Sequence, residues 1–429
     1  MYSIGKEGKP MTFLQAAKQI EDDIIAIRRD LHLYPEIALQ EKRTIEQVVK
    51  HLELLDVQIE IIPNGGIIAT MEGNKRGKTL ILRADLDALP IEEAETNLQG
   101  KKQVVSKNKG AAHLCGHDGH TAMLLGAAKI LHQYRENIEG NVIFVFEQAE
   151  ENGQGIYRLL QRLVEIGADG VWGIHLKSDI PSKKVSVEAG PRMAGVLPFA
   201  VKIHGKGGHG SRPDLAHSPV DCFHDFYEQI QLQQYRNTDP FQPVTISVGS
   251  VLSGSKDTAN VIPNTLTFNG TGRFLHKEQG VVLEEQFKQA LETACAQNNC
   301  TYEWLRPLKA MPMQVYNEET CADIAKESVI SSLGEQALTN APAWMASEPF
   351  SFYQKYFPGV FAFLGIKNEA KGTGAEHHNE HFDIDEDVLH LGTALTVQYV
   401  FDFLNSDLKI NYDKETKDVT TLFTEYGLI

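Results

Sequence analysis

The stretch His113-Leu-Cys-Gly-His-Asp-Gly-His120 places three histidines, a thiol and a carboxylate within eight residues. Cys115 and His117 are two positions apart, and in a strand or a tight loop such side chains share a face. Thiolate sulfur and imidazole nitrogen are ligands of Zn²⁺ and of other first-row divalent ions. Histidine-rich loops also occur without metal, as solvated turns, but this density of histidines beside a cysteine favours a metal site.

The segments on either side of this stretch predict an α/β domain. Thr79–Arg83 has the pattern of a strand, and Asn141–Phe146 is a nearly continuous apolar run, as in a buried parallel strand. Apolar residues at three- and four-residue spacing predict helices over residues 11–33 and 121–135. We expect further strands at Val57–Ile62, Gly66–Met71, Gly170–His175 and Gly359–Gly365, and further helices at Glu41–Leu54, Gly155–Ile166, Glu319–Leu333 and 386–404.

Beyond Gly190 the sequence predicts a second domain. The chain of 429 residues is longer than one hydrophobic core usually organises. Strands that alternate in polarity and are separated by helices indicate a small α+β sandwich with one open sheet face over residues 192–308. Residues 1–191 and 309–429 would then form one discontinuous catalytic domain. The strands are predicted at Phe199–His204, Thr245–Val251 and Thr265–Arg273, and the helices at Pro219–Tyr235 and Glu278–Gln297.

Composition narrows the functional class. A formal net charge of −16 argues against binding to nucleic acid or to an anionic membrane, since both require a basic surface. Five scattered cysteines do not form a disulfide framework and suit a reducing compartment. The N-terminus has no hydrophobic signal core, and no run of about 18 apolar residues could span a bilayer. We therefore expect a cytoplasmic protein.

Other polar clusters come directly after predicted strands. Asp85 and Asp87 follow one strand, the adjacent Glu150 and Glu151 follow another, and His175 ends a third. Open α/β sheets usually carry their chemistry at the carboxyl ends of their strands. The loop His377-His-Asn-Glu-His-Phe382 offers three further candidate ligands. Together these segments could hold two ions about 3.5–4 Å apart, an arrangement that polarises a carbonyl and activates water.

Several motifs together resemble the metal-dependent aminoacylase/carboxypeptidase family, in the branch of hippurate hydrolase, bacterial N-acyl-amino-acid amidohydrolases and plant auxin-conjugate hydrolases. The resemblance covers about residues 15–405. It rests on Arg28-Arg-Asp-Leu-His-Leu-Tyr-Pro-Glu36, Arg83-Ala-Asp-Leu-Asp-Ala-Leu-Pro90, the stretch from His113 to His120, Glu150-Glu151, Gly207-Gly-His-Gly210 followed by Pro213, Asn260-Val-Ile-Pro263, Ser347-Glu348-x-Phe350 and His378-x-x-x-Phe-Asp-Ile-Asp385.

The resemblance implies a role for each residue of the site. Cys115 would bridge two divalent metal ions, for which Mn²⁺ or Zn²⁺ is preferred and Ni²⁺ or Co²⁺ also fits the ligands. One ion would be completed by His117 and His175, and the other by Glu151 and His378. Glu150 would be the general base. His113 and His120 are expected to hold the loop by hydrogen bonds to its surroundings, with His377 and His381 as flanking residues.

The family also implies a fold and an assembly. A zinc-peptidase-like catalytic domain with a mixed sheet flanked by helices would carry an inserted ferredoxin-like lid or dimerisation domain. His209 of this inserted domain would reach the substrate across a homodimer, or within a homotetramer, and steady the oxyanion. Asn260 and Arg273 would belong to the same surface and bind the substrate carboxylate, although an arginine on a half-exposed strand is usually only solvated.

The expected activity is hydrolysis of the amide bond of an N-acyl-amino acid. A dipeptidase or carboxypeptidase is the alternative within enzymes, and a metal-binding protein without turnover is an alternative of another class. The sequence departs from the family pattern at Gln148, Asp214, Pro349 and Glu380. These positions lie in loops around the substrate, so they leave the acyl group and the amino acid open but not the hydrolysis.

Overall fold

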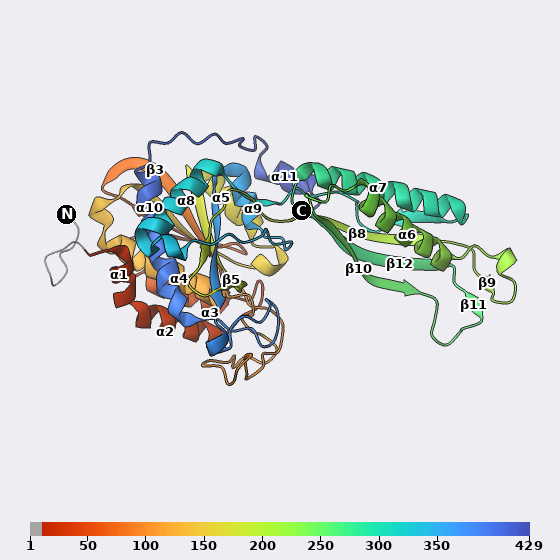
Figure 1. The fold of residues 1–429 in the computed structure, drawn as a ribbon, viewed down its shortest axis with the longest axis horizontal. Helices are drawn as coiled ribbons and strands as arrows, with labels where there is room; N and C mark the ends of the chain where they lie inside the picture. Colours follow the sequence, from red (N-terminus) through yellow and green to blue (C-terminus); the bar gives the residue numbers. More distant parts are fainter. Residues whose placement is uncertain (1–10) are drawn as a thin grey trace. The chain divides into compact units, whose positions relative to one another are not determined.

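The computed structural model describes residues 11–429, which form two units (Figure 1). The larger unit runs up to Gly190 and includes Tyr316–Pro342 and Pro349–Thr421, and the smaller unit comprises Pro191–Val315, Ala343–Glu348 and Leu422–Ile429. The smaller unit thus contains the predicted insertion 192–308 and three further segments. Two of these are tied to residues 194–196 by backbone hydrogen bonds, from Met311 N to Val196 O (2.7 Å) and from Ala194 N to Ala346 O (2.8 Å). Such isolated pairings have no sequence period that would predict them.

The larger unit is built on a seven-stranded mixed sheet. The neighbouring strands β4, β3, β5 and β15 are parallel, and antiparallel strands complete the sheet at both sides. In spatial order the strands are β1 (Gln58–Ile62), β2 (Gly66–Glu72), β4 (Glu139–Glu147), β3 (Lys75–Asp85), β5 (Gly170–Pro181), β15 (Gly359–Lys367) and β6 (Val185–Ser186). The mixed sheet expected from the sequence is confirmed.

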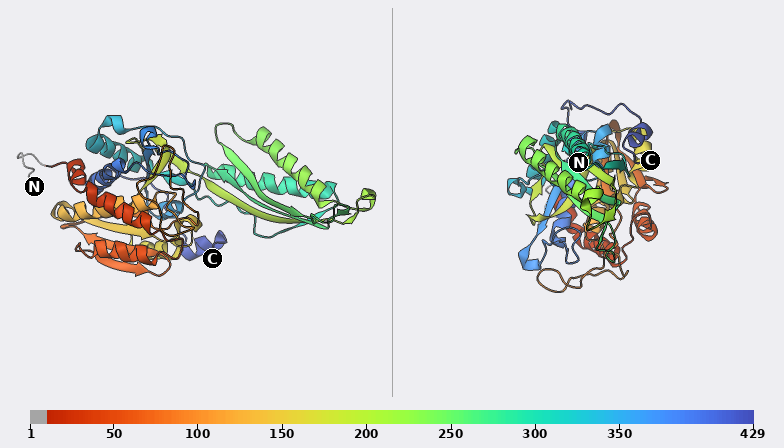
Figure 2. Two further views of the ribbon diagram at one scale, coloured as in Figure 1. Left: turned by 90° about the horizontal axis from the view of Figure 1, so that it is seen from below. Right: turned by 90° about the vertical axis from the view of Figure 1, so that its right-hand side faces the viewer.

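Helices cover both faces of this sheet (Figure 2). Gly170 of β5 lies against Phe403 of α10, whereas Gly173 lies against Phe350 of α9. Because residues three apart on a strand face opposite ways, α10 and α9 lie on opposite faces. The helices of this unit are α1 (Phe13–Gln19), α2 (Glu21–Leu33), α3 (Lys42–Leu52), α4 (His117–Gln133), α5 (Ile156–Ile166), α8 (Glu319–Leu333), α9 (Phe350–Tyr356) and α10 (Leu389–Leu404).

Three details of this unit differ from the sequence-based expectation. The helix predicted over 11–33 is interrupted at Ile20, where α1 ends and α2 begins. Helix α4 begins at His117 rather than at residue 121, because Gly116 adopts a left-handed φ of 95° that turns the chain directly into the helix. Strand β5 continues six residues past His175 to Pro181. The candidate ligand His175 therefore lies within a strand and not at its end.

The smaller unit has the βαββαβ order of a ferredoxin-like fold. Its antiparallel sheet has the strand order β10-β12-β8-β13. Both helices pack on one face of this sheet (Figure 2), where Phe226 of α6 contacts Phe268 and Phe287 of α7 contacts Phe199. The elements are β8 (Gly195–His204), α6 (Pro219–Asn237), β10 (Val244–Ser253), β12 (Thr265–Phe274), α7 (Lys277–Gln297) and β13 (Thr301–Trp304), with a separate pair β9 (Gly208–His209) and β11 (Val261–Ile262).

The remaining strands and α-helix among the described residues are β7 (Gly190–Met193), β14 (Val315–Asn317) and α11 (Val419–Glu425), each of which includes a boundary between the units. None of the helices within residues 11–429 combines the length and the apolar character that crossing a lipid bilayer requires.

Candidate metal centre

The candidate ligands come from segments that meet near the ends of the central parallel strands. Strand β3 ends at Asp85 and is paired there with Glu147, the last residue of β4. After β4 the chain turns through Ala149, whose φ of 54° is left-handed, into a short 3₁₀ turn that carries Glu150 and Glu151. Left-handed backbone is unusual for alanine, so the surrounding contacts must hold this turn in place.

Cys115, His117 and His175 form the first donor group. Their ligand atoms lie within 4.8 Å of one another, and all three residues are buried. Cys115 Sγ is 3.6 Å from His175 Nε2. His117 Nδ1 donates to Asp87 O (2.9 Å) and His175 Nδ1 donates to Leu176 O (2.6 Å), because a carbonyl can only accept. When its ring is neutral, each of these histidines therefore carries its lone pair on Nε2, the atom that faces the other donors. Although burial opposes it, Asp85 and Cys115 raise the pKa of His117, so a bound cation would displace its second proton.

Cys115 belongs also to a second donor group, with Glu151 and His378, whose ligand atoms lie within 4.8 Å of one another. His378 Nε2 is 3.3 Å from Glu151 Oε1. His378 has a left-handed φ of 65°, and its backbone N donates to Leu114 O (2.9 Å), beside Cys115. The backbone thus brings together two segments that lie more than 250 residues apart in the chain.

The donor set fits divalent cations. His117 Nε2 and Glu151 Oε1 are buried and have no hydrogen-bond partner. A buried polar atom without a partner is costly unless a bound group satisfies it. Sulfur, imidazole and carboxylate donors together are typical of zinc and related first-row ions. Two cations that share the Cys115 sulfur would satisfy both atoms.

Other acidic and histidine side chains nearby have hydrogen bonds of their own. His120 Nδ1 donates to Asp85 Oδ1 (2.7 Å), and His120 Nε2 accepts from Leu176 N (2.9 Å). The two carboxylate oxygens of Asp87 accept from the backbone N of Glu150 and of Glu151, each at 3.1 Å. Asp87 therefore fixes both the His117 segment and the glutamate turn, and these side chains support the donors.

Glu150 lies beside the first donor group. Its Oε2 is 3.7 Å from His117 Nε2, and the residue is buried. The strained turn before it is held by Glu41, whose carboxylate accepts from Ala149 N (2.8 Å) and from Gln148 Nε2 (2.8 Å). Gln148 is one of the positions at which the sequence departs from the family pattern. Its side chain thus adds a hydrogen bond that supports the turn.

Burial shifts the pKa of two of the donors, Cys115 and His175. It raises the pKa of the Cys115 thiol to about 12, and the nearby Glu151 acts in the same direction. The thiol alone would stay protonated at neutral pH, and a bound cation would displace its proton. Burial, together with the adjacent His120, holds the pKa of His175 well below its usual range, which keeps the ring neutral as a ligand requires.

We expect hydrogen bonds that hold the loop from His113 and His120, and only a flanking place for His377 and His381. His120 makes the expected hydrogen bonds, His377 Nε2 accepts from Ser178 N (3.2 Å) and His381 Nδ1 donates to Thr96 O (2.8 Å). The expectation that His113 holds the loop by hydrogen bonds is wrong, because both of its ring nitrogens are buried without a partner. Burial lowers the pKa of His113 to about 4.

His209, Asn260 and Arg273 all belong to the smaller unit. His209 is exposed at the end of β9, where it pairs with Val261 of β11, next to Asn260. Asn260 precedes the start of β12 at Thr265, whereas Arg273 lies near the other end of this strand, about 25 Å from that start. The Nη1 of Arg273 donates to Ser347 Oγ (2.6 Å). Within one copy, Asn260 and Arg273 are therefore separated by most of the length of β12.

Two named relatives and one solved structure are similar to this chain over most of its length. Thermostable carboxypeptidase 1 of Saccharolobus solfataricus is 36% identical over 90% of this chain and 97% of its own length. N-acetylcysteine deacetylase of Bacillus subtilis is 34% identical over 87% of this chain and 95% of its own length. A crystal structure of a dinuclear metal-binding peptidase of the M20 family from Bacillus subtilis is 30% identical, covers 90% of this chain and 99% of its own, and superposes with a TM-score of 0.76.

A sequence model of the family described as peptidase family M20/M25/M40 matches residues 81–402. That range contains both donor groups and the whole of the inserted segment 192–308. The resemblance inferred from the motifs is confirmed. The chain belongs to peptidase family M20/M25/M40.

Proposed function

We propose that the chain is a two-metal hydrolase that cleaves the amide bond of N-acyl-amino acids and releases a carboxylic acid and a free amino acid. The observation that carries the proposal is the pair of donor groups that share Cys115, with Glu150 beside them. The relatives support it, because one is named for the deacetylation of N-acetylcysteine and another for carboxypeptidase activity.

In this proposal His117 and His175 would hold one divalent cation, Glu151 and His378 would hold a second, and Cys115 would contribute to both sites. The cations, Mn²⁺ or Zn²⁺ by preference, would polarise the amide carbonyl and lower the pKa of water towards about 7. The protein holds the donors in position beforehand. Asp87 and Leu176 orient the two imidazoles, and Cys115, His117 and His175 are buried.

Glu150 is the proposed general base. Its backbone is fixed by Asp87, and its carboxylate lies next to the donors without being assigned to either cation. It would accept a proton from the attacking water and then deliver that proton to the leaving nitrogen, so that the amine departs neutral. An amide needs this second step because an amide anion is a very poor leaving group.

We further propose that a second copy of the chain contributes to catalysis, in a homodimer or a homotetramer. His209 is exposed, and its Nδ1 lies 2.8 Å from the Oγ of its neighbour Ser211. Its imidazole would stabilise the oxyanion in the active site of the partner. Asn260 and Arg273 would contact the substrate, and the guanidinium of Arg273 would bind the carboxylate of the substrate. A thiolate ligand also suits the reducing cytoplasm, where we place the protein.

A carboxypeptidase or dipeptidase is the second candidate function. It is favoured by the 36% identity to Thermostable carboxypeptidase 1 over 90% of this chain. A metal-binding protein without turnover is less consistent with the site, because Glu150 is present and buried beside the donors.

A substrate panel distinguishes these functions. Purified protein loaded with Mn²⁺ or Zn²⁺ is assayed for kcat/KM on N-acetyl-amino acids, N-benzoyl-amino acids and dipeptides. The proposal expects the acyl-amino acids to have the highest kcat/KM. Higher values for dipeptides would establish the exopeptidase, and no hydrolysis of any substrate would favour the non-catalytic protein.

A further inference from the structure

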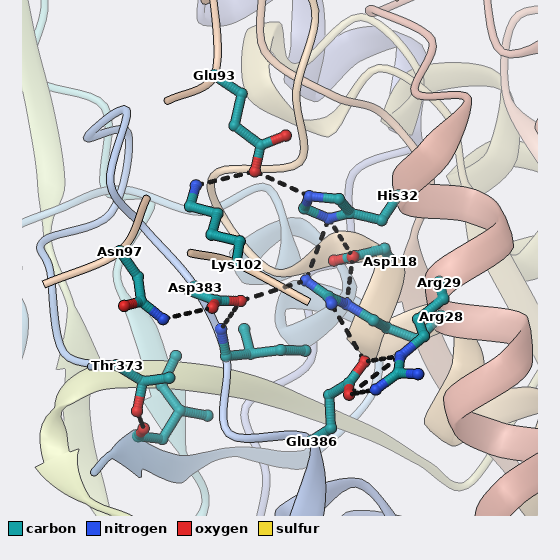
Figure 3. A network of polar contacts seen from close by, with 12 residues as sticks. Arg28, Arg29, His32, Glu93, Asn97, Lys102, Asp118, Thr373, Asp383 and Glu386 are labelled. Atoms are coloured by element: carbon teal, nitrogen blue, oxygen red, sulfur yellow. Dashed lines mark hydrogen bonds and ion pairs between the residues drawn. The ribbon is translucent and has the colours of Figure 1, made fainter. Parts of the chain in front are cut away.

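A buried network of charged side chains lies beside the candidate metal centre, outside both donor groups (Figure 3). It connects helix α2, the loop around residues 93–102, the start of helix α4 and the segment 383–386. The network includes Arg28, His32, Glu93, Lys102, Asp118, Asp383 and Glu386. Buried ion pairs add little stability on average, because desolvation offsets their attraction, so stability alone does not explain this network.

One end of the network holds the start of α4. His32 Nδ1 is 2.8 Å from Asp118 Oδ2, and Arg28 Nε is 2.7 Å from the same oxygen. Asp118 directly follows the candidate ligand His117. On its other side, His32 Nε2 is 2.9 Å from Glu93 Oε1. Both ring nitrogens of His32 thus face a carboxylate. Burial and the nearby Arg28 lower the pKa of His32, but these carboxylates outweigh them and raise it.

The other end of the network is Lys102. Its side chain is fully buried, and its Nζ lies 2.8 Å from Glu93 Oε1. The same Nζ donates to the backbone oxygen of Glu380 at 2.9 Å. Ala94 N donates to that oxygen as well (3.1 Å). A buried ammonium is expensive unless its protons are used, and here one of them holds a carbonyl only two residues beyond His378.

The turn that carries His378 depends on such contacts with other segments. His378 has a left-handed φ, and its side chain is 47% exposed. The turn is tied to the loop 93–102 at Glu380 O and through His381 Nδ1, which donates to Thr96 O. Strained backbone persists when its surroundings hold it, so the place of the His378 imidazole depends on this loop.

We infer that Lys102 is a positioning residue for His378, and that through it the affinity of the second cation site depends on the buried network. This inference rests on the proposed function, in which Glu151 and His378 hold the second cation. The first site, with His117 and His175, has its own hydrogen bonds to backbone carbonyls and does not involve Lys102.

The test is a titration of metal-free protein with Mn²⁺, in which free Mn²⁺ is counted by electron paramagnetic resonance. Wild-type protein is expected to bind two ions. Lys102→Met removes the donor to Glu380 O and should weaken one of the two sites by about 10–100-fold, the usual cost of losing a supporting contact, while the other site is unchanged. Lys102→Arg retains a buried donor and should restore part of the affinity.

A matched control is Lys101→Met, which removes the adjacent but exposed lysine and should bind both ions as wild type does. Because Lys102→Met leaves Glu93 without its ammonium partner, this variant could fail to fold. The double variant Lys102→Met, Glu93→Gln removes both charges together. It should fold and show the same weakening of one site.

The outcomes separate the inference from the proposed function. A wild-type protein that binds fewer than two ions would overturn the two-metal proposal itself, and the inference with it. A wild-type protein that binds two ions, together with a folded Lys102 variant that binds both as tightly, would overturn the inference alone. Equal weakening of both sites would also overturn it, because the loss would then not be specific to His378.

Discussion

The candidate site residues of the two units differ in their burial and in the hydrogen bonds that hold them. In the larger unit Cys115, His117 and His175 are buried, and both imidazoles are oriented by backbone carbonyls. In the smaller unit His209 is exposed on a strand of two residues and lies beside Ser211. An oxyanion donor is effective only where water is excluded. We therefore propose that the larger unit holds the cations by itself, and that His209 acts only when a further surface packs over it.

The largest expected effect concerns Glu150. Glu150→Gln should lower kcat by up to about 10⁴-fold, because the variant cannot take up the proton of the attacking water. Its metal content should equal that of wild type, since Glu150 is assigned to neither cation. Steady-state kinetics and metal analysis on the same sample measure both.

The adjacent glutamate provides the control. Glu151→Gln should lose metal as well as activity, because Glu151 Oε1 is a donor of the second group. A Glu150→Gln protein that lacks metal, beside a Glu151→Gln protein that retains it, would reverse the two assignments.

A substitution at His209 tests the candidate site residues of the smaller unit. His209→Ala should lower kcat by about 10²–10³-fold, the usual cost of an oxyanion donor, with full metal content. His224→Ala, which removes another exposed histidine of the smaller unit, should behave as wild type. Mixing inactive His209→Ala with inactive Glu150→Gln should restore activity if the histidine acts across a dimer. Failure of the mixture to recover, once subunit exchange is verified, would place His209 in its own subunit's site or outside catalysis.

Cys115 tests whether the two donor groups share one atom. Cys115→Ser should lower the affinity for both cations by about 10–100-fold, because a hydroxyl oxygen replaces a sulfur that is common to both donor groups. Cys321→Ser, a change at a buried thiol in α8 of the same unit, should keep both ions. Weakening of one ion alone would show that Cys115 is not shared.

The smallest effect is expected for the stability of the buried network. His32 and Lys102 hold the pKa of Glu93 at about 2, below its ordinary value of 4.5, although burial acts in the opposite direction. A lowered pKa in the folded state stabilises the protein above pH 4.5, and this contribution of about 3 kcal/mol is lost as the pH falls towards 2. Denaturant unfolding should show a shallower decline between pH 4.5 and 2 for Glu93→Gln than for wild type. Parallel curves would contradict the ion-pair account.

Sequence alone predicted the ligand-bearing segments, because each carries a distinct signal. An apolar run before Glu150 and Glu151 indicates a buried strand, and a cysteine among histidines indicates a metal site. The family motifs then predicted that His378 joins them, although no local pattern connects residues so far apart. The hydrolase class and the mixed sheet are confirmed by the comparisons and the fold.

The supporting residues could not be predicted in the same way. Lys102 is a charged residue in a polar loop, and lysine in such a context is usually exposed. Only the fold shows that Glu93 and Glu380 surround it. Asn260 and Arg273 are likewise separated by the length of β12, and short sequence motifs give no information about that distance.

The most direct test of the account is a crystal structure of the metal-loaded protein with anomalous diffraction from the metal. The account predicts two anomalous peaks about 3.5–4 Å apart, with Cys115 Sγ bound to both, His117 and His175 on one and Glu151 and His378 on the other. A single peak, or two peaks that leave His378 unbound, would contradict it.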